Sequence, residues 1–212
     1  MIKNTETTTS ADYAKYLIDN QNSLKSFLLQ LPYRLHLMSL RLGMTLDIGC
    51  GAGRNLKALN LNSIGIDHNA ILVESCKLRG LQAYSTDDFL KNGSKYIACF
   101  DSILISHVAE HMSLNDFVVL LKEYKSFLKP AGVVVVICPQ ELGYASDSTH
   151  IHFMDFKELE KALKASGFEV LSQYSYPFPR FFGKWFTHNE FVVNAKLTRG
   201  FNQNDVVCHT VF

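Results

Sequence analysis

The chain has 212 residues, of which 47% are apolar, so it is long enough to bury one substantial core and short for two independent domains. Its 21 basic and 20 acidic residues leave a formal net charge of +1, which provides no strong positive field to attract polyanions. Nucleic acid is therefore not expected as the main partner. The five cysteines are scattered and lack the C-x-x-C spacing of a zinc site or a redox pair.

No segment has the pattern of a targeting or membrane-spanning sequence. The first residues are polar and lack an apolar core of signal-peptide length. No uninterrupted apolar run approaches the ~20 residues needed to cross a bilayer. The sequence predicts a cytoplasmic protein with no membrane span.

Helical periodicity dominates the first part of the chain. Apolar residues between Ala11 and Gln30 recur mostly at three- and four-residue steps, which predicts an amphipathic helix. Pro32 is expected to break this helix, because proline lacks the N–H donor that a helix interior needs. A helical pattern resumes from Tyr33 to Leu42, and Gly43 is expected to end it in the left-handed conformation.

From Met44 onward, short strand-like runs alternate with helical stretches. The runs are nearly continuous in apolar residues, which is typical of parallel strands buried on both faces. The expected strands are 44–48, 63–66, 81–85, 100–105, 133–138, 168–176 and 190–197, and the expected helices are 54–59, 70–78, 113–128 and 155–167. The last two strands are expected to pair antiparallel. This order predicts an α/β domain at 44–212, with residues 1–43 as a helical cover within the same unit.

The most informative segment is a strand that runs into a turn containing Gly49, Gly51 and Gly53. Glycine permits positive φ and lets a ligand approach the backbone, while a following helix offers unpaired N–H groups. These features predict a pocket for an anionic or zwitterionic ligand. The glycines alone leave the question open, because tight turns between a strand and a helix also use glycine without binding a ligand.

An acidic residue, Asp67, ends the next strand. In an open α/β sheet the carboxyl ends of neighbouring strands face one crevice, where a carboxylate can accept hydrogen bonds from both ribose hydroxyls. Together with the glycine turn, Asp67 predicts a nucleoside site. The alternative is that Asp67 only caps the helix that begins near Asn69.

Two details of the glycine turn bear on which nucleoside it binds. Arg54 stands where the dinucleotide motif G-x-G-x-x-G needs its third glycine, and it would crowd the helix against the strand and the pyrophosphate. Asp47 lies two residues before Gly49, where its charge would repel a pyrophosphate but attract the ammonium and sulfonium groups of S-adenosylmethionine. The turn therefore favours this methyl donor over a nicotinamide or flavin dinucleotide.

These segments resemble the class I S-adenosylmethionine-dependent methyltransferases, and they occur in that family's order. Leu46–Gly53 is similar to the first motif, Ile64–Asp67 to the second strand with its ribose-binding acid, Thr86–Phe89 to the segment that holds the adenine amino group, and Phe100–His111 to the fourth strand and its following turn. The resemblance spans residues 44–197 and implies a Rossmann-like, doubly wound sheet of about seven strands with the last one antiparallel. It implies cofactor contacts at Asp47, Gly49, Cys50, Gly51, Gly53, Asp67, His68, Asp87, Asp88, Phe89, Ser106 and His107.

Two histidines are candidates for a general base. Methyl transfer is an in-line displacement in which the donor carries the reactivity, so a base is needed only when the acceptor must lose a proton. His150 and His152 follow the fifth strand, and in an extended stretch their side chains share a face. One of them is expected to act on the substrate. The alternative is that His150 hydrogen-bonds backbone while His152 is solvated.

A possible metal motif follows the fourth strand. His107 and His111 are four residues apart with Glu110 between them, which is the spacing of two metal ligands on one helix face. The sequence shows no third ligand, and similar stretches in the family shape the donor pocket. We therefore expect no metal.

The sequence thus predicts an enzyme that methylates an O, N or C atom of a small molecule, as a monomer or homodimer. Three alternatives stay open: an aminopropyl transferase that uses a decarboxylated relative of the donor, a scaffold that binds the donor without turnover, and an oxidoreductase. An aromatic segment at 174–186 either lines a cavity, contacts a second subunit or covers the edge of the core.

Overall fold

The computed structural model describes residues 10–11, 14–15, 17–18 and 24–198. The chain divides into two compact units, Met1–Ser94 and Lys95–Phe212. Three described strands lie in the first unit and four in the second. The α/β class and the expected number of strands are confirmed, whereas the assignment of residues 1–43 as a cover of a domain at 44–212 stays a prediction.

The first described residues of the first unit are mostly helical. Residues 11, 14–15 and 17–18 are helical, and the rest of the expected helix before Leu24 lies outside the described residues. Helix α3 (Leu24–Ser39) then runs through Pro32, so the prediction that Pro32 breaks the helix is wrong. The proline removes one backbone donor, but good helix formers surround it and the buried Leu37 anchors the second half of the helix. Arg41 and Gly43 take positive φ after the helix ends.

Three short parallel strands form the sheet of the first unit, in the order β3-β2-β1. They are β1 (Thr45–Ile48), β2 (Ile64–Asp67) and β3 (Ala83–Ser85), and the first two are buried along their whole length. Helix α4 (Ala70–Leu78) packs on β2 and β3, and the side chain of Asn69 caps it by accepting from the Ile71 N–H. Helix α5 (Thr86–Asn92) follows β3, and Ser85 caps it.

The segment after the glycine turn differs from the prediction. The helix expected at 54–59 is only a 3-10 helix, η1 (Leu56–Ala58), preceded by turns. The left-handed Gly53 sets a tight entry to this short segment. A second 3-10 helix, η2 (Gly93–Tyr96), follows α5.

The second unit contains four strands in the order β4-β5-β7-β6. They are β4 (Phe100–Ser106), β5 (Leu128–Pro139), β6 (Phe168–Tyr176) and β7 (Glu190–Leu197). β4 and β5 are parallel, whereas β7 pairs antiparallel with both β5 and β6, so the expected antiparallel last strand is confirmed.

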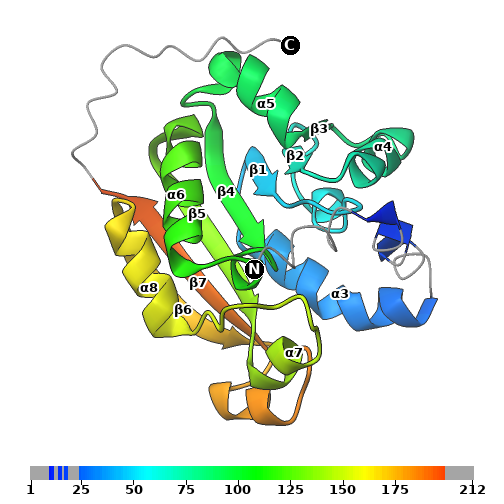
Figure 1. The fold of residues 1–212 in the computed structure, drawn as a ribbon, viewed down its shortest axis with the longest axis vertical. Coiled ribbons are helices and arrows are strands. Elements are labelled where there is room, and N and C mark those ends of the chain that lie inside the picture. The colour runs from blue at the N-terminus through cyan, green and yellow to red at the C-terminus, as the bar shows by residue number, and fades with distance from the viewer. Residues whose placement is uncertain (1–9, 12–13, 16, 19–23, 199–212) are drawn as a thin grey trace. The chain divides into compact units, whose positions relative to one another are not determined.

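Two helices of the second unit, α6 (Leu114–Tyr124) and α8 (Phe156–Ala165), lie side by side along its strands (Figure 1). The carboxylate of Asp155 caps α8 by accepting from the N–H groups of Lys157 and Glu158, so the helix expected at 155–167 is present. The remaining elements are the short helix α7 (Glu141–Ala145) and the 3-10 helices η3 (Ala109–His111), η4 (Lys125–Phe127) and η5 (Arg180–Lys184).

The helix expected at 113–128 ends earlier, at Tyr124, because Leu128 pairs with Phe100 as the first residue of β5. β5 therefore begins before the predicted Val133. The residues between Leu128 and Val133 have no partner in the β4 ladder, and Ala131 among them takes a positive φ of 68°. Pairing with β4, which is distant in sequence, thus outweighed the local helical pattern of residues 125–128.

Candidate active site

The glycine turn uses most of its backbone N–H groups internally. The N–H groups of Gly49 and Cys50 donate to the Ile66 carbonyl at 2.8 and 3.0 Å, and the N–H of Gly53 donates to the Cys50 carbonyl at 3.0 Å. The N–H of Gly51 donates to Asp67 Oδ2 at 2.9 Å. These four N–H groups therefore hold the turn together, and the predicted donors of the segment that follows the turn stay a prediction.

The positive φ values of Gly49 and Gly51, 70° and 55°, allow the chain to fold back onto β2 in this way. Such a turn is poorly suited to a pyrophosphate, which needs several backbone donors aimed at it. The structure thus strengthens the case against a dinucleotide.

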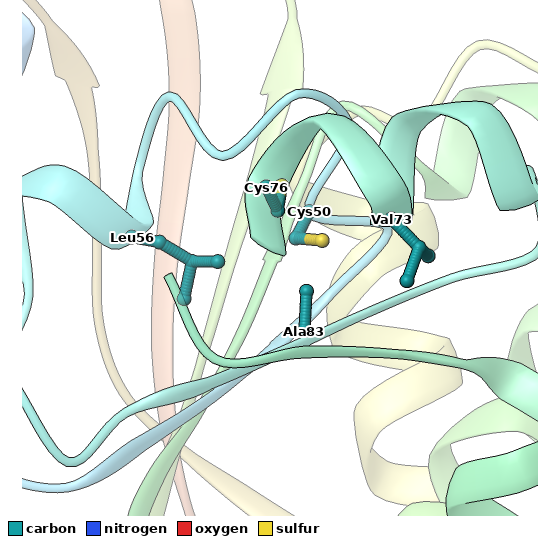
Figure 2. Packing of buried hydrophobic residues seen from close by; sticks show 5 residues of the cluster. All are labelled: Cys50, Leu56, Val73, Cys76 and Ala83. Atoms are coloured by element: carbon teal, nitrogen blue, oxygen red, sulfur yellow. The ribbon is translucent and has the colours of Figure 1, made fainter. Parts of the chain in front are cut away.

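A small apolar cluster supports the turn from behind (Figure 2). It consists of Cys50, Leu56, Val73, Cys76 and Ala83. A Cβ on Gly53 would lie 2.5 Å from Leu81 Cδ1 and 3.0 Å from Cys76 Sγ, and a Cβ on Gly65 would lie 2.7 Å from Cys50 Sγ. Glycine at these two positions therefore permits the close packing that holds the turn in place.

Asp47, on β1, is a buried carboxylate of the first unit. Its side chain is 0% exposed, and neither carboxylate oxygen has a hydrogen-bond partner among the described residues. Burial raises the pKa of Asp47 to about 7; the nearby Arg54 cation opposes this shift and the charge of Asp67 adds to it. A buried carboxylate without a partner is costly, so this position suits a cation or a hydrogen-bond donor of a ligand.

Asp67 ends β2 and is buried, with both oxygens engaged. Oδ2 accepts from the Gly51 N–H, and Oδ1 accepts from the Asn69 N–H at 2.8 Å. The helix cap of α4 comes from Asn69 and not from Asp67, so the alternative role of Asp67 as the direct cap is not what the structure contains. Each carboxylate oxygen has a second lone pair, which leaves Asp67 able to accept from ribose hydroxyls. The neighbouring His68 is half exposed.

The residues expected near the adenine lie at the start of α5. Asp87 and Asp88 are exposed, and Asp88 Oδ2 accepts a hydrogen bond from the Ser85 hydroxyl at 2.7 Å. Phe89 is buried in the core. Contacts of these three residues with an adenine ring stay a prediction.

In the second unit, β4 ends at Ser106 and the chain turns sharply at His107, which has a φ of 58°. His107 Nε2 lies 2.8 Å from Glu190 Oε1, and its Nδ1 lies 3.3 Å from Glu110 Oε1. Burial alone would lower the pKa of His107, but the two carboxylates outweigh it and raise the pKa to about 9. His107 is thus held as an imidazolium, and its predicted contact with the cofactor stays a prediction.

Glu110, on η3, is the counterpart of Asp47 in the second unit. It is 0% exposed, and neither oxygen accepts a hydrogen bond from the described residues. Burial acts to raise the pKa of Glu110, but the adjacent His107 outweighs it and the pKa lies below its usual value. Burial and the charge of Glu110 also raise the pKa of the Cys138 thiol.

The candidate bases His150 and His152 contact different groups. The side chain of His150 is 7% exposed, and its Nδ1 donates to the Tyr144 carbonyl at 2.8 Å. The side chain of His152 is 36% exposed, and its Nε2 lies 3.3 Å from Glu158 Oε2. The backbone hydrogen bond expected in the alternative interpretation of His150 is therefore present.

Three of the residues that contact these histidines, Glu190, Tyr144 and Thr149, were not among the predicted site residues. Glu190 lies far along the chain from His107, and Tyr144 and Thr149 carry no motif. Only the pairing of β5 with the start of β7 brings Glu190 next to the loop after β4. No local pattern could have revealed it.

Comparison with known proteins identifies the family. A family model described as a methyltransferase domain matches residues 20–173. No curated protein sequence matches the chain. Among the described residues, no helix is both long enough and apolar enough to cross a bilayer.

Several solved structures share the fold. A SAM-dependent methyltransferase from Archaeoglobus fulgidus is 19% identical, with a TM-score of 0.58 over 82% of this chain and 100% of that one. Magnesium protoporphyrin IX methyltransferase (ChlM) from Synechocystis PCC 6803, solved with bound SAH, is 11% identical, with a TM-score of 0.65 over 91% and 97% of the two chains. The cyclase SpnF is 18% identical, with a TM-score of 0.55 over 78% and 80%.

At such identities the structures share a fold, and the cyclase among them illustrates that this fold hosts more than one reaction. The family model carries the assignment, because it covers more than half of the chain. The chain belongs to the methyltransferase-domain family, as the order of its motifs predicted.

Proposed function

We propose that this methyltransferase takes its methyl group from S-adenosylmethionine, bound at the glycine turn, and delivers it to an O, N or C atom of a small molecule. The observation that carries the proposal is Asp47, a fully buried carboxylate with no hydrogen-bond partner among the described residues. When bound, S-adenosylmethionine supplies a methyl group on a sulfonium that is already reactive.

Each residue of the turn has a distinct role in this proposal. Asp47 attracts the cationic amino acid part of the donor, and in doing so gains the partner that it lacks. Asp67 accepts from the ribose hydroxyls while it holds the turn through Gly51. Gly49 and Gly51 leave the backbone bare where the ligand approaches.

The general base, where an acceptor needs one, is best assigned to His152. Its side chain is 36% exposed, whereas that of His150 is 7% exposed. A base must reach within hydrogen-bond distance of the proton that it removes, which favours the more accessible imidazole. The cytoplasmic location and the monomeric or homodimeric state stay predictions from the sequence.

Calorimetry on the purified chain tests the donor. We expect S-adenosylhomocysteine and S-adenosylmethionine to bind and NADH not to bind. Release of S-adenosylhomocysteine with quinols, phenols, amines or fatty acids then identifies the acceptor class. Binding of the donor without turnover on any acceptor would favour a scaffold. A preference for the decarboxylated donor would favour an aminopropyl transferase, and binding of NADH would favour an oxidoreductase.

Replacement of Asp67 tests the ribose contact. Asp67→Asn is expected to weaken S-adenosylhomocysteine binding by about 10- to 100-fold, since one acceptor becomes a donor at a site built for hydroxyl groups. Asn69→Ala is the matched control: it removes the neighbouring cap of α4 and leaves the carboxylate in place. Equal affinity in wild type and Asp67→Asn would reject the ribose assignment.

A further inference from the structure

A cluster of metal-ligating groups lies in the second unit, apart from the residues assigned to the donor. Glu110, His111 and His150 each offer one ligand atom, and these atoms all lie within 4.8 Å of one another. Glu110 and His111 come from η3, and His150 comes from the loop after α7. The backbone links the two segments, because the N–H of Ile151 donates to the Glu110 carbonyl at 2.9 Å.

The orientation of both imidazoles suits metal binding. His150 Nδ1 lies 2.8 Å from the Tyr144 carbonyl, and His111 Nδ1 lies 3.3 Å from the Thr149 carbonyl. His111 Nδ1 also lies 3.1 Å from Thr149 Oγ1, whose own proton is donated to Asp147 Oδ1. These oxygens all accept, so each Nδ1 carries the proton and each Nε2 has a free lone pair in the neutral ring. Histidines that bind metals are held by the same kind of second hydrogen bond.

The carboxylate of Glu110 provides an independent observation. It is fully buried, and neither oxygen has a hydrogen-bond partner among the described residues. Its Oε1 lies 3.9 Å from His150 Nε2, the atom with the free lone pair. A second carboxylate oxygen, Asp147 Oδ2, also lies 3.9 Å from His150 Nε2, while Asp147 Oδ1 is held by the Thr149 hydroxyl at 2.7 Å.

We propose that Glu110, His111 and His150 bind a divalent first-row transition-metal ion, with Asp147 able to serve as a fourth ligand. Two imidazoles with carboxylates suit Zn²⁺ and its neighbours, whereas Mg²⁺ and Ca²⁺ prefer all-oxygen sites. Ligand atoms of a tetrahedral Zn²⁺ site lie about 3.4 Å apart, given bonds of about 2.1 Å. The 3.9 Å separations therefore need to contract by about 0.5 Å, and a separation at the 4.8 Å limit of the three-residue group by about 1.4 Å.

The competing interpretation is that Glu110 serves only as an ion-pair partner of His107. Glu190 already contacts His107 at 2.8 Å, which is closer than the 3.3 Å contact to Glu110. The His107 pair also leaves unexplained why His111 and His150 converge on the same carboxylate. The metal site accounts for all three side chains, and it does not depend on the proposed methyl donor.

Titration of the purified full-length chain with Zn²⁺ tests the site, after treatment with a chelator and its removal. We expect uptake of one equivalent with micromolar or tighter affinity, and Co²⁺ in its place is expected to give the visible absorption bands of a nitrogen-ligated ion. Millimolar Mg²⁺ is expected not to compete. The thermal midpoint is expected to rise with Zn²⁺, since only the folded chain brings the ligands together.

Two variants separate the metal site from other roles. His150→Asn keeps a donor for the Tyr144 carbonyl and removes the Nε2 ligand, and Glu110→Gln removes the charge at constant size. Each is expected to weaken Zn²⁺ binding by more than about 100-fold, because outer partners of a metal site alone account for about 10- to 100-fold. The matched control is His152→Ala, whose imidazole faces Glu158 and lies outside the three-residue group.

Circular dichroism of each variant verifies that it is folded. If Glu110→Gln does not fold, His150→Asn and the Co²⁺ spectrum of the wild type carry the test. No uptake of Zn²⁺ or Co²⁺ by the folded wild type, or equal Zn²⁺ affinity in wild type and His150→Asn, would overturn the proposal. Competition by Mg²⁺ at similar concentration would overturn the assigned class of metal.

Discussion

Asp47 in the first unit and Glu110 in the second are alike in burial and opposite in surroundings. Both side chains are 0% exposed and lack hydrogen-bond partners among the described residues. Burial raises the pKa of Asp47 to about 7, although the Arg54 cation and the Asn55 side chain act to lower it. The pKa of Glu110 is lowered instead, since His107 overcomes the same effect of burial.

The contrast shows that burial by itself does not decide the charge of a carboxylate. A buried ion needs a partner of opposite charge, and the free energy of keeping it without one is several kcal/mol. Glu110 has imidazoles around it that suit a metal ion, whereas Asp47 has no histidine among the groups that affect its pKa. Each carboxylate therefore fits a different cation.

The largest expected effect is on stability against pH, with Asp47→Asn compared with wild type in the absence of donor. The pKa of Asp47 is 3.8 unfolded and about 7 folded, so between these values the folded state holds a proton that the unfolded state has lost. Ionisation then favours unfolding as pH rises from 4 to 7. The free energy of unfolding of the variant, relative to that of wild type, is expected to increase by up to about 4 kcal/mol over this range, and not to increase further above pH 7.

Chemical denaturation at a series of pH values measures this difference. Other carboxylates are common to both proteins and cancel in the comparison. A constant difference between pH 4 and pH 8 would show that Asp47 is ionised in the folded protein.

Donor affinity sharpens the same contrast. A cationic ligand holds Asp47 ionised, so binding of S-adenosylmethionine is expected to release a proton below pH 7 and to weaken by about tenfold per pH unit there. Asp47→Asn is expected to be weaker by about 100-fold at pH 8 and nearly independent of pH. Calorimetry from pH 5.5 to 8 in buffers of different ionisation enthalpy measures both effects, and a flat profile for wild type would contradict them.

The smallest expected effect is the stability of Glu110→Gln in the presence of a chelator. His107 keeps Glu190 but loses its second carboxylate, which is expected to lower the free energy of unfolding by about 1 kcal/mol. This change in the free energy of unfolding has the opposite sign to the change expected for Asp47→Asn at neutral pH. Glu158→Gln is the matched control, because its pair with His152 is partly exposed and is expected to change stability by less than about 0.5 kcal/mol. If Glu110→Gln were more stable than wild type, Glu110 would be a destabilising buried charge, as is expected of Asp47 at neutral pH.

Much of the fold was predictable because its signals are local. The strand ranges 168–176 and 190–197 and the helix 70–78 agree with the structure, since each is a run of uniform periodicity with clear ends. Where the prediction failed, at Pro32, at 54–59 and at the start of β5, packing or strand pairing outweighed local propensity.

The candidate site divides in the same way. The glycine spacing is visible in the sequence, because a turn with bare backbone requires glycine. The acids Asp47 and Asp67 are visible because each stands at a strand that the apolar pattern predicts. Their electrostatic state is not visible. That Asp47 is unpartnered, that Gly51 donates to Asp67, and that the turn uses its own donors all depend on how β1 and β2 pack.

Short stretches of the sequence therefore determine the family and the order of strands and helices, because periodicity and glycine placement act over a few residues. The convergence of His150 on Glu110 and of Glu190 on His107 was decided only in the folded chain. Contacts between residues so far apart in sequence arise from strand pairing and burial. The energies of both depend on residues that are close only in the folded structure, so a local pattern does not predict them.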